Sequence, residues 1–261
     1  MTRWIRASIV LALVAVPAGV IAGEQTSQPT PQTDRHIDPD ADRLLRGMAD
    51  YLAHLKNFAV RSSTVDEVVT TDGRKIEVTG DHALYVSRPN RLRSEQLGNA
   101  KGMWFRDDGK SMTLYCDADR TYATVPAPPT IDATIDTVRK DYQIEAPAAD
   151  LLYSHPYDVL TEQVKSGQFI GKETVDGVEA NHLAFQGDDV DWQIWIQDGP
   201  RPLPLRYEIT SKTVKDEPEF SVRLSRWQPQ AHLDEATFRS NPPVGSKKVA
   251  SFPTSCGAAH P

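Results

Sequence analysis

Two series of short strand-like segments, joined by tight turns, constrain the fold of this chain most strongly. In the first series, Phe58–Thr70 and Lys75–Val86 flank an Asp72-Gly73 turn, and Asp-Gly between such runs is a strong hairpin signal. In the second series, another Asp-Gly turn joins Phe169–Thr174 to Val178–Gln186. Consecutive strands joined by short turns pair antiparallel, so the sequence predicts an antiparallel sheet.

The remaining strands are predicted from similar short runs bounded by turn residues. They are Arg91–Leu97, Met103–Arg106, Met112–Cys116, Thr121–Val125, Val190–Gln197, Leu205–Val214 and Phe220–Trp227. Along Val190–Gln197 apolar and polar residues alternate, with Trp192, Ile194 and Ile196 on one face and Gln193 and Trp195 on the other. This alternation is typical of an antiparallel strand with one buried face.

Helical spacing of apolar residues marks one helix before the strands and a helical insert between the two series. Asp38-Pro39-Asp40 places a capping acid before a proline at the first helical position. The apolar face of this first helix is formed by Ala41, Leu44, Leu45, Met48, Leu52 and Leu55. In the insert, a helix is predicted from Ile131 to Tyr142, followed by two short helices at Pro147–Tyr153 and Pro156–Thr161.

The order of these elements predicts an α+β fold. A single antiparallel sheet of about 11 strands tends to curl, and helices packed on its concave face account for the order of helix, strands, insert and strands. We therefore expect a strongly curved sheet, or half-open β-barrel, covered by a lid of helices. The space between sheet and lid is the expected position of an apolar cavity.

The first residues of the chain have the pattern of a secretory signal peptide. Arg3 and Arg6 precede the apolar run Ala7–Val16, which is too short to span a bilayer, and small residues follow at Val20–Ala22. An uncleaved anchor is the alternative. We predict a signal peptide at 1–22, a flexible leader at 23–38, one folded domain at 39–249 and a flexible tail at 250–261. The protein is accordingly expected in the periplasm, with no stable membrane insertion after cleavage.

The charge of the chain limits the class of partner. The formal net charge is −7, and the basic residues form no cluster. An acidic chain without a basic patch is a poor ligand for nucleic acids and for anionic membranes. Nucleic-acid binding is therefore excluded from the expected functions.

The two cysteines, Cys116 and Cys256, lie 140 residues apart in the sequence. Export to an oxidising compartment permits a disulfide between them, but Cys116 also fits a buried free thiol. Two cysteines without matched histidine spacing do not form a zinc site. We expect no metal site and no cofactor.

No pattern of catalytic residues stands out. The seven histidines occur in no catalytic or metal-binding motif, and His182 with Asp191 is more simply explained as a surface pair on a sheet. The acid pairs Asp107-Asp108 and Asp188-Asp189 lie in turns, where aspartate is expected for local hydrogen bonding. We therefore expect a protein that is not an enzyme, with a hydrolase as a remote alternative.

The tryptophans offer a stronger functional lead. Trp104, Trp192, Trp195 and Trp227 lie in predicted strands, where they either fill the core or line a lipid-sized pocket. The residues predicted to line the cavity are Leu44, Met48, Trp104, Trp192, Ile194, Ile196 and Phe220.

Three short motifs resemble the LolA-like superfamily, the fold of the periplasmic lipoprotein carriers, over about 200 residues. They are Gly80–Asn90 (GDHALYVSRPN), Asp108-Gly109-Lys110 with Tyr115, and Leu233–Phe238 followed by Pro242-Pro243-Val244-Gly245. Between Val175 and Pro204 the chain is more similar to a periplasmic branch of unassigned function. The resemblance implies the same half-barrel fold. It also implies that Arg88, in the R-P-N motif, latches the lid helices through their backbone carbonyls, and a guanidinium has enough donors for this role.

These observations lead to a main hypothesis and an alternative. The main hypothesis is a periplasmic carrier or chaperone-like protein that binds a lipid, an acyl chain or a lipidated protein between sheet and lid. The alternative is an envelope sensor or protein-interaction module built on the same fold, with an envelope protein as its partner.

Overall fold

The computed structural model describes residues 35–98, 102–252 and 256. The signal peptide, most of the leader and most of the tail predicted from the sequence lie outside these residues. None of the helices in the described ranges is long and apolar enough to cross a membrane.

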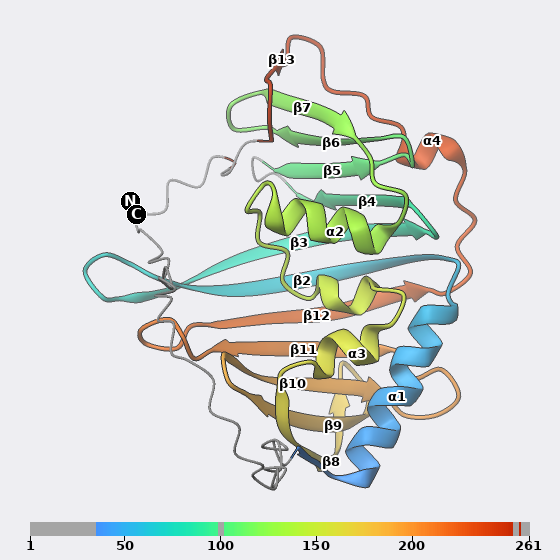
Figure 1. Cartoon of the computed structure of the whole chain (residues 1–261), viewed down its shortest axis with the longest axis vertical. Helices are drawn as coiled ribbons and strands as arrows, with labels where there is room; N and C mark the ends of the chain where they lie inside the picture. The colour runs from blue at the N-terminus through green and yellow to red at the C-terminus, as the bar shows by residue number, and fades with distance from the viewer. Residues whose placement is uncertain (1–34, 99–101, 253–255, 257–261) are drawn as a thin grey trace, which may run out of the picture. The chain divides into compact units, whose positions relative to one another are not determined.

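The described chain forms one sheet and a small number of helices (Figure 1). The helices are α1 (Pro39–His54), α2 (Ile131–Lys140), the 3₁₀ helix η1 (Ala149–Leu152), α3 (Pro156–Thr161) and α4 (Glu235–Phe238). The strands are β1 (His36–Ile37), β2 (Asn57–Val69), β3 (Lys75–Ser87), β4 (Arg91–Gln96), β5 (Met103–Asp107), β6 (Ser111–Cys116), β7 (Thr121–Pro126), β8 (Val164–Val175), β9 (Val178–Gly187), β10 (Val190–Gln197), β11 (Pro204–Ser211), β12 (Glu219–Gln228) and β13 (Lys247–Lys248).

The sheet joins the two predicted series of strands side by side. Its order is β1-β8-β9-β10-β11-β12-β2-β3-β4-β5-β6-β7-β13, so the last strand of the second series pairs with the first strand of the first. Each series is an antiparallel meander, and both predicted Asp-Gly hairpins form, with Gly73 and Gly177 at a φ of 82°. Glycine is favoured there because other residues rarely adopt positive φ.

The sheet has 13 strands instead of the predicted number of about 11. The two additional strands, β1 and β13, are two residues long and pair parallel to β8 and β7 at the two edges. A two-residue strand has no alternation that a sequence pattern can reveal. The sheet is therefore mixed at its edges, and antiparallel elsewhere.

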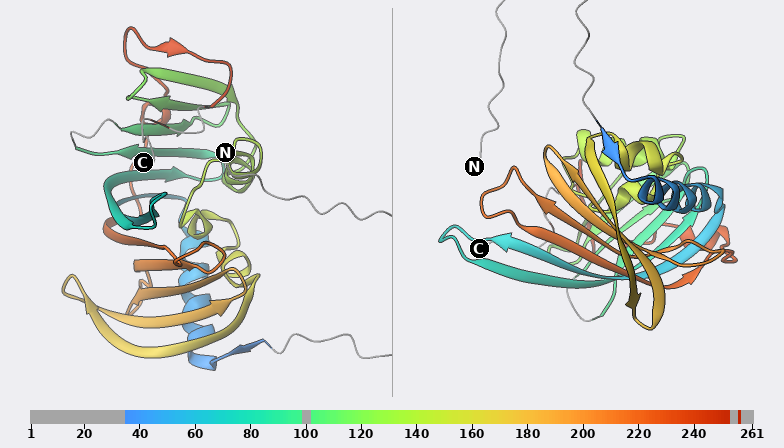
Figure 2. Two further views of the ribbon diagram at one scale, coloured as in Figure 1. Left: turned by 90° about the vertical axis from the view of Figure 1, so that its left-hand side faces the viewer. Right: turned by 90° about the horizontal axis from the view of Figure 1, so that it is seen from below.

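The predicted α+β class and curved sheet are confirmed. The sheet is open, because its edge strands β1 and β13 do not pair with each other, and α1, α2, η1 and α3 cover its concave face (Figure 2). Asp38 caps α1 by accepting a hydrogen bond from the backbone N–H of Asp40 at 2.7 Å, as its position before Pro39 predicts. The apolar side of α1 then packs against the sheet through Leu45 and Met48.

Most of the core lies between these helices and the second series of strands. Leu45, Met48, Ile194 and Ile196 are fully buried there, and burying such a side chain stabilises the fold by about 1.5 to 3 kcal/mol. A second, smaller cluster forms where α2 and the C-terminal segment cover β6 and β7. Its buried members are Met112, Leu114, Ala123 and Phe252.

Candidate functional site

An open pocket of about 640 Å³ lies between the lid and the concave face of the sheet. It is bordered by α2, η1 and α3 on the lid side, and by β10 and β11 on the sheet side. Pockets of about 300 to 1,000 Å³ are the usual size for small-molecule ligands. A second hollow, of about 150 Å³, lies beside the β-bulge of β12 at Arg226.

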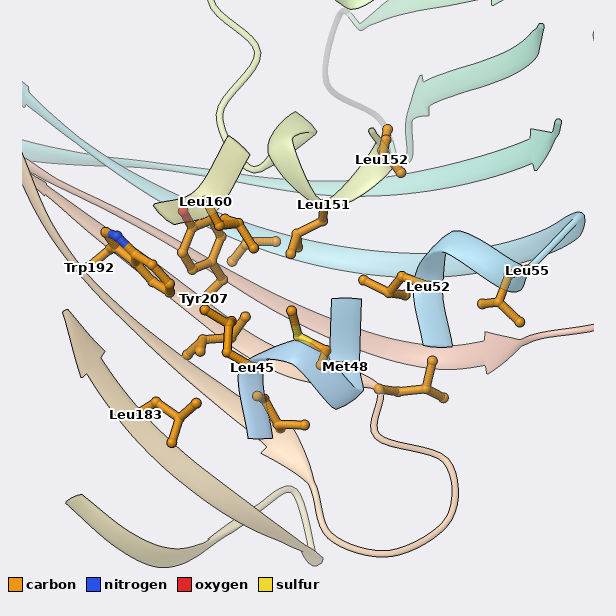
Figure 3. Packing of buried hydrophobic residues seen from close by; sticks show 14 of the residues in the cluster. Leu45, Met48, Leu52, Leu55, Leu151, Leu152, Leu160, Leu183, Trp192 and Tyr207 are labelled. Carbon is orange, nitrogen blue, oxygen red and sulfur yellow. The ribbon is translucent and has the colours of Figure 1, made fainter. Parts of the chain in front are cut away.

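Two aromatic residues from neighbouring strands form the sheet side of the pocket. Trp192 of β10 and Tyr207 of β11 meet edge to face, with ring centroids 5.7 Å apart, and Phe185 stacks on Trp192 at 4.0 Å. Figure 3 shows Trp192 and Tyr207 close to Leu160 of α3. Only 4% of Trp192 and 3% of Tyr207 is exposed. These rings give the pocket an apolar floor.

Both of these side chains nevertheless carry a polar atom without a protein partner. Among the described residues, nothing hydrogen-bonds the indole nitrogen of Trp192 or the hydroxyl of Tyr207, and both residues line the pocket. Burial raises the pKa of Tyr207 far above its usual range, so the hydroxyl stays protonated. The pocket floor therefore presents two hydrogen-bond donors in an apolar setting.

The rim of the pocket is charged, and most of its charged groups are paired with one another. Arg139 of α2 binds Asp150 of η1 at 2.8 Å and donates to the backbone carbonyl of Ala146 at 2.7 Å. Tyr153 donates to Asp136 at 2.9 Å, and burial together with this hydrogen bond raises the pKa of Tyr153 to about 12. These contacts hold α2 against η1 at the edge of the pocket.

The lid is attached to the first series of strands near the R-P-N motif. Arg88 donates to the backbone carbonyl of Tyr153 at 3.4 Å, and the N–H of Ile131 donates to the carbonyl of Pro89 at 2.8 Å. Within the insert itself, Asp132 accepts from the N–H of Ser154 at 3.0 Å. Burial lowers the pKa of Arg88, and its Nε is buried without a partner. The guanidinium thus touches the lid backbone, as the resemblance implies, through a single long hydrogen bond.

A second set of contacts joins the first helix to the lid. The Tyr157 hydroxyl of α3 binds the Asp42 carboxylate of α1, and Arg46 donates to the same hydroxyl at 2.8 Å. The guanidinium carbon of Arg46 also lies 3.7 Å from the centroid of the Tyr157 ring. Helix α1 and the insert thereby form one cover over the sheet.

The predicted cavity residues fall into three groups. Trp192 lines the pocket. Residues Leu44, Met48, Ile194, Ile196 and Phe220 belong to the large core cluster, with no part in the pocket lining. Trp104 lies on the opposite, convex face, where it stacks on Tyr115 at 5.3 Å, while its neighbour Phe105 faces the core. A strand of only five residues gave too little alternation to place Trp104.

Sequence reasoning missed the polar residues of the pocket. Tyr207 falls in the predicted strand Leu205–Val214, and Arg139 and Asp150 fall in the predicted helical segments of the insert, with no pattern that marks them as site residues. The alternation of β11, in which Tyr207 and Ile209 lie on the face opposite to Arg206, places Tyr207 on the core side. Only the pairing with β10 brings it to Trp192. No local signal predicts that α2 and η1 converge over this face.

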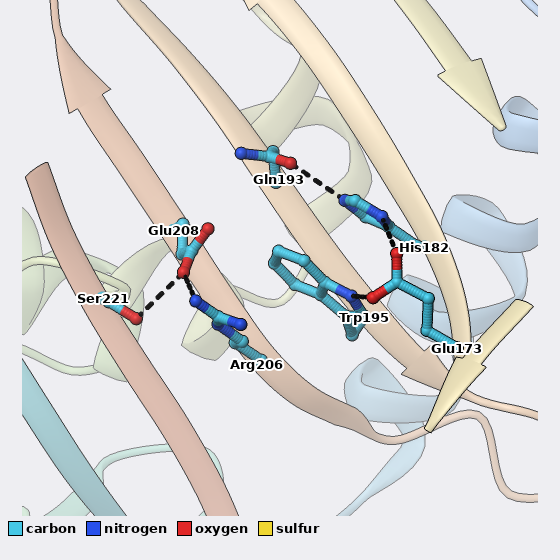
Figure 4. Close-up of polar contacts among 7 residues, drawn as sticks. All are labelled: Glu173, His182, Gln193, Trp195, Arg206, Glu208 and Ser221. Carbon is cyan, nitrogen blue, oxygen red and sulfur yellow. Dashed lines mark hydrogen bonds and ion pairs between the residues drawn. The ribbon is translucent and has the colours of Figure 1, made fainter. Parts of the chain in front are cut away.

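The convex face of the same strands carries a polar cluster (Figure 4). His182 binds Glu173 through Nδ1 at 2.8 Å and Gln193 through Nε2 at 2.9 Å, and it stacks on Trp195 at 4.1 Å. Trp195 donates to Glu173 at 2.8 Å, and this bond, followed by the bond from His182, lowers the pKa of Glu173. Beside it, Arg206 pairs with Glu208. Because all these groups bind one another, the cluster is organised as structural support.

The two cysteines are joined. Cys116, at the end of β6, and Cys256, close to the C-terminus, form a disulfide with their Cα atoms 5.2 Å apart. This link holds the C-terminal segment beside β6 and β7, where Phe252 packs against Tyr142 at 4.5 Å. In the described part of the chain, no group of three or more His, Cys, Asp and Glu residues could hold a metal ion.

Comparison with known proteins places the chain in a periplasmic family. Residues 41–251 match the model of a family described as "Predicted periplasmic protein (DUF2092)". The periplasmic location predicted from the sequence is thereby confirmed. No curated protein matches the sequence.

Several solved structures are similar to this chain at low sequence identity. An uncharacterised conserved protein of Thermus thermophilus is 12% identical, with a TM-score of 0.48 over 81% of this chain and 99% of its own. LprF from Mycobacterium bovis is 16% identical, with a TM-score of 0.47 over 78% and 98%. The LolA superfamily protein NE2245 of Nitrosomonas europaea is 11% identical, with a TM-score of 0.36 over 77% and 97%.

Proposed function

Because the chain belongs to the DUF2092 family of predicted periplasmic proteins, we propose that it binds a lipid or another acyl-bearing molecule in the periplasm. The ligand enters the pocket between the lid and the concave face of the sheet. The protein acts as a carrier or chaperone for this ligand and not as an enzyme. We also propose that residues 1–22 direct its export as a signal peptide and that 39–249 form the binding domain.

The observation that carries this proposal is the pocket itself. Its floor is made of Trp192 and Tyr207, and Val159, Leu160 and Val190 add apolar surface around it. Burying an acyl chain contributes about 0.8 kcal/mol for each CH₂ group, so the apolar side of this pocket supports affinity for such a chain. The polar rim keeps the entrance hydrated.

We propose that the lid opens to admit the ligand. Arg88 and Pro89 bond its backbone to the first series of strands, and Thr134 of α2 donates to the buried Asp107 carboxylate at 2.8 Å. Ile131 and Ile135 of α2 also pack in the large core cluster. A single hydrogen bond contributes about 0.5 to 1.5 kcal/mol, so the free energy of ligand binding must offset the loss of these contacts when the lid opens.

The direct test is to identify what the exported protein contains. The full chain is purified from periplasm, its bound lipids are extracted and analysed by mass spectrometry, and binding of the uncharged probe N-phenyl-naphthylamine is measured by fluorescence. We expect co-purified acyl lipids and saturable probe binding. The absence of both would reject the proposal.

A variant that fills the pocket locates the binding site. Val159 is half-buried and lines the pocket, so Val159→Trp places a large ring in it from the lid side. The control is Val244→Trp, at a position that is 98% exposed. We expect Val159→Trp to lower probe affinity at least about tenfold, or 1.4 kcal/mol, while Val244→Trp leaves it unchanged. Equal affinity in both variants would place the site elsewhere.

A further inference from the structure

We propose that the pocket selects an uncharged acyl ester, such as an acylglycerol or the ester-linked acyl group of a lipidated protein, whose carbonyl oxygen binds Trp192 and Tyr207. The inference rests on the proposed function and adds the chemical class of the ligand's polar group. It depends on two features of the pocket, which are the unpartnered donors of the floor and the charge balance of the rim.

The floor donors are exceptional within this protein. In the described residues, four Trp and Tyr side chains are less than 5% exposed, namely Tyr115, Trp192, Trp195 and Tyr207. Outside the pocket, Trp195 donates to Glu173 at 2.8 Å and Tyr115 donates to Asp117 at 3.0 Å. In the pocket, Trp192 and Tyr207 have no protein partner. Neither of these two donor atoms is sealed off from solvent, so each can be reached from the pocket, where a ligand acceptor takes the place of water.

The two donors on the pocket floor restrict which kind of ligand atom can bind them. An indole N–H only donates, and a tyrosine hydroxyl that stays protonated donates as well. Two donors within one apolar floor therefore suit a single oxygen with two lone pairs. An ester carbonyl supplies such an oxygen at the junction between the polar group of a lipid and its acyl chain.

The rim argues against an anionic ligand. Its ionisable groups are the carboxylates of Asp136, Asp150 and Glu162 and the cations of Arg139 and Lys140. Arg139 is paired with Asp150 and Lys140 with Asp136, while the Glu162 carboxylate makes no hydrogen bond or ion pair among the described residues. The unbalanced charge at the entrance is therefore negative. A fatty-acid carboxylate or a phosphate would lose its hydration and meet repulsion there.

The test compares two ligands with the same chain and different polar groups. Monopalmitoylglycerol and palmitate, both below their micelle concentrations, compete with N-phenyl-naphthylamine on the full chain at neutral pH. We expect the ester to bind at least about tenfold more tightly than the carboxylate, a difference of 1.4 kcal/mol. A synthetic lipopeptide with ester-linked acyl chains, run in parallel, distinguishes a lipidated protein from a free acylglycerol as the source.

Single-atom variants test the hydrogen bonds. Tyr207→Phe removes the hydroxyl and keeps the ring, and we expect it to weaken ester binding about threefold to tenfold, the value of one hydrogen bond, with probe binding unchanged. Tyr122→Phe, on β7 and outside the pocket, is the matched control.

The outcomes separate the two proposals. Palmitate binding as tightly as the ester, or ester binding that Tyr207→Phe does not weaken, would overturn this inference and leave the proposed function intact. Probe binding without binding of either palmitoyl compound would also overturn this inference and leave the proposed function intact. If neither the probe nor any acyl compound binds, the proposed function itself fails.

Discussion

Strand β10 buries one tryptophan on its concave face and one on its convex face, and the indole nitrogens of the two make different contacts. Trp192 on the concave face and Trp195 on the convex face are both 4% exposed. Trp195 lies between His182 and Arg206 and donates to Glu173. Trp192 lies between Phe185 and Tyr207, and its indole nitrogen has no partner in the described chain.

The difference shows that burial alone does not distinguish a structural aromatic from a ligand-binding one. The convex tryptophan satisfies its polar atom within the fold, as buried polar groups usually do. The concave tryptophan leaves its donor open to a pocket. An unsatisfied donor beside a pocket is therefore the more informative signal, and the predictions below test whether the two faces differ as this implies.

The largest effect is expected from a charge placed on each face. Ile194→Lys puts a cation in the fully buried core under α1, and we expect a loss of more than about 4 kcal/mol or no folded protein. Gln193→Lys, one residue away on the convex face, meets Glu208 on the neighbouring strand and should cost about 1 kcal/mol. Denaturant unfolding measures both. Similar losses would show that the two faces are equally packed.

Removing each indole nitrogen separates the two tryptophans. Trp195→Phe breaks the hydrogen bond to the Glu173 carboxylate, whereas Trp192→Phe breaks none. We expect Trp195→Phe to lower the free energy of unfolding by about 1 to 2 kcal/mol more than Trp192→Phe. In lipid-binding assays the order should reverse, because only Trp192 lines the pocket. Equal destabilisation by the two variants would contradict the comparison.

The two buried tyrosines, Tyr115 and Tyr207, should differ in the same way as the two tryptophans, with a smaller effect on the free energy of unfolding. Tyr115→Phe removes a hydroxyl that binds Asp117, so we expect a loss of about 1 kcal/mol. Tyr207→Phe removes a hydroxyl without a protein partner, so ligand-free stability should stay the same or rise slightly. Thermal unfolding of lipid-free protein is the measurement. A clear loss of stability in Tyr207→Phe would reveal a partner for its hydroxyl.

A histidine gives the concave face a pH dependence. His82 of β3 lies on the same side of the sheet as Leu84, and burial lowers its pKa below the usual value of about 6.5. The folded state therefore binds fewer protons than the unfolded state, so stability is full above about pH 6.5 and falls as the pH drops through the lowered pKa. His82→Gln should lose less stability than the wild type between pH 7.5 and pH 5. Identical losses would exclude this contribution from His82.

The smallest and most local effect is expected at Arg88. Its one hydrogen bond to the lid is long, and its Nε is buried without a partner. Arg88→Met should therefore change global stability by less than about 1 kcal/mol. Hydrogen exchange of the amides in α2 and η1 should become faster if Arg88 latches the lid, while β9 and β10 stay protected. Unchanged exchange in the lid would show that Arg88 is no latch.

Local sequence patterns predicted much of the fold because turns, helix caps and strand alternation depend on residues that are close together in the sequence. The Asp-Gly turns, the capped helix α1 and the alternation of β10 all appear in the structure where the sequence places them. The order of strands and insert was sufficient to predict a curved sheet under helices. Short elements were harder to predict. Strands β1 and β13 are only two residues long and were not predicted, and β5 is too short to reveal on which face Trp104 lies.

The sequence by itself determined which residues of a strand share a face, because side chains alternate along a strand wherever it lies. It therefore grouped Trp192 with Ile194 and Ile196 correctly. Only the tertiary structure decided that Trp192 borders a pocket while Ile194 and Ile196 lie under α1. That outcome depends on the pairing of β10 with β11, which brings Tyr207 to Trp192, and on where α2, η1 and α3 cross the sheet. These contacts join residues far apart in sequence, so no local pattern encodes them.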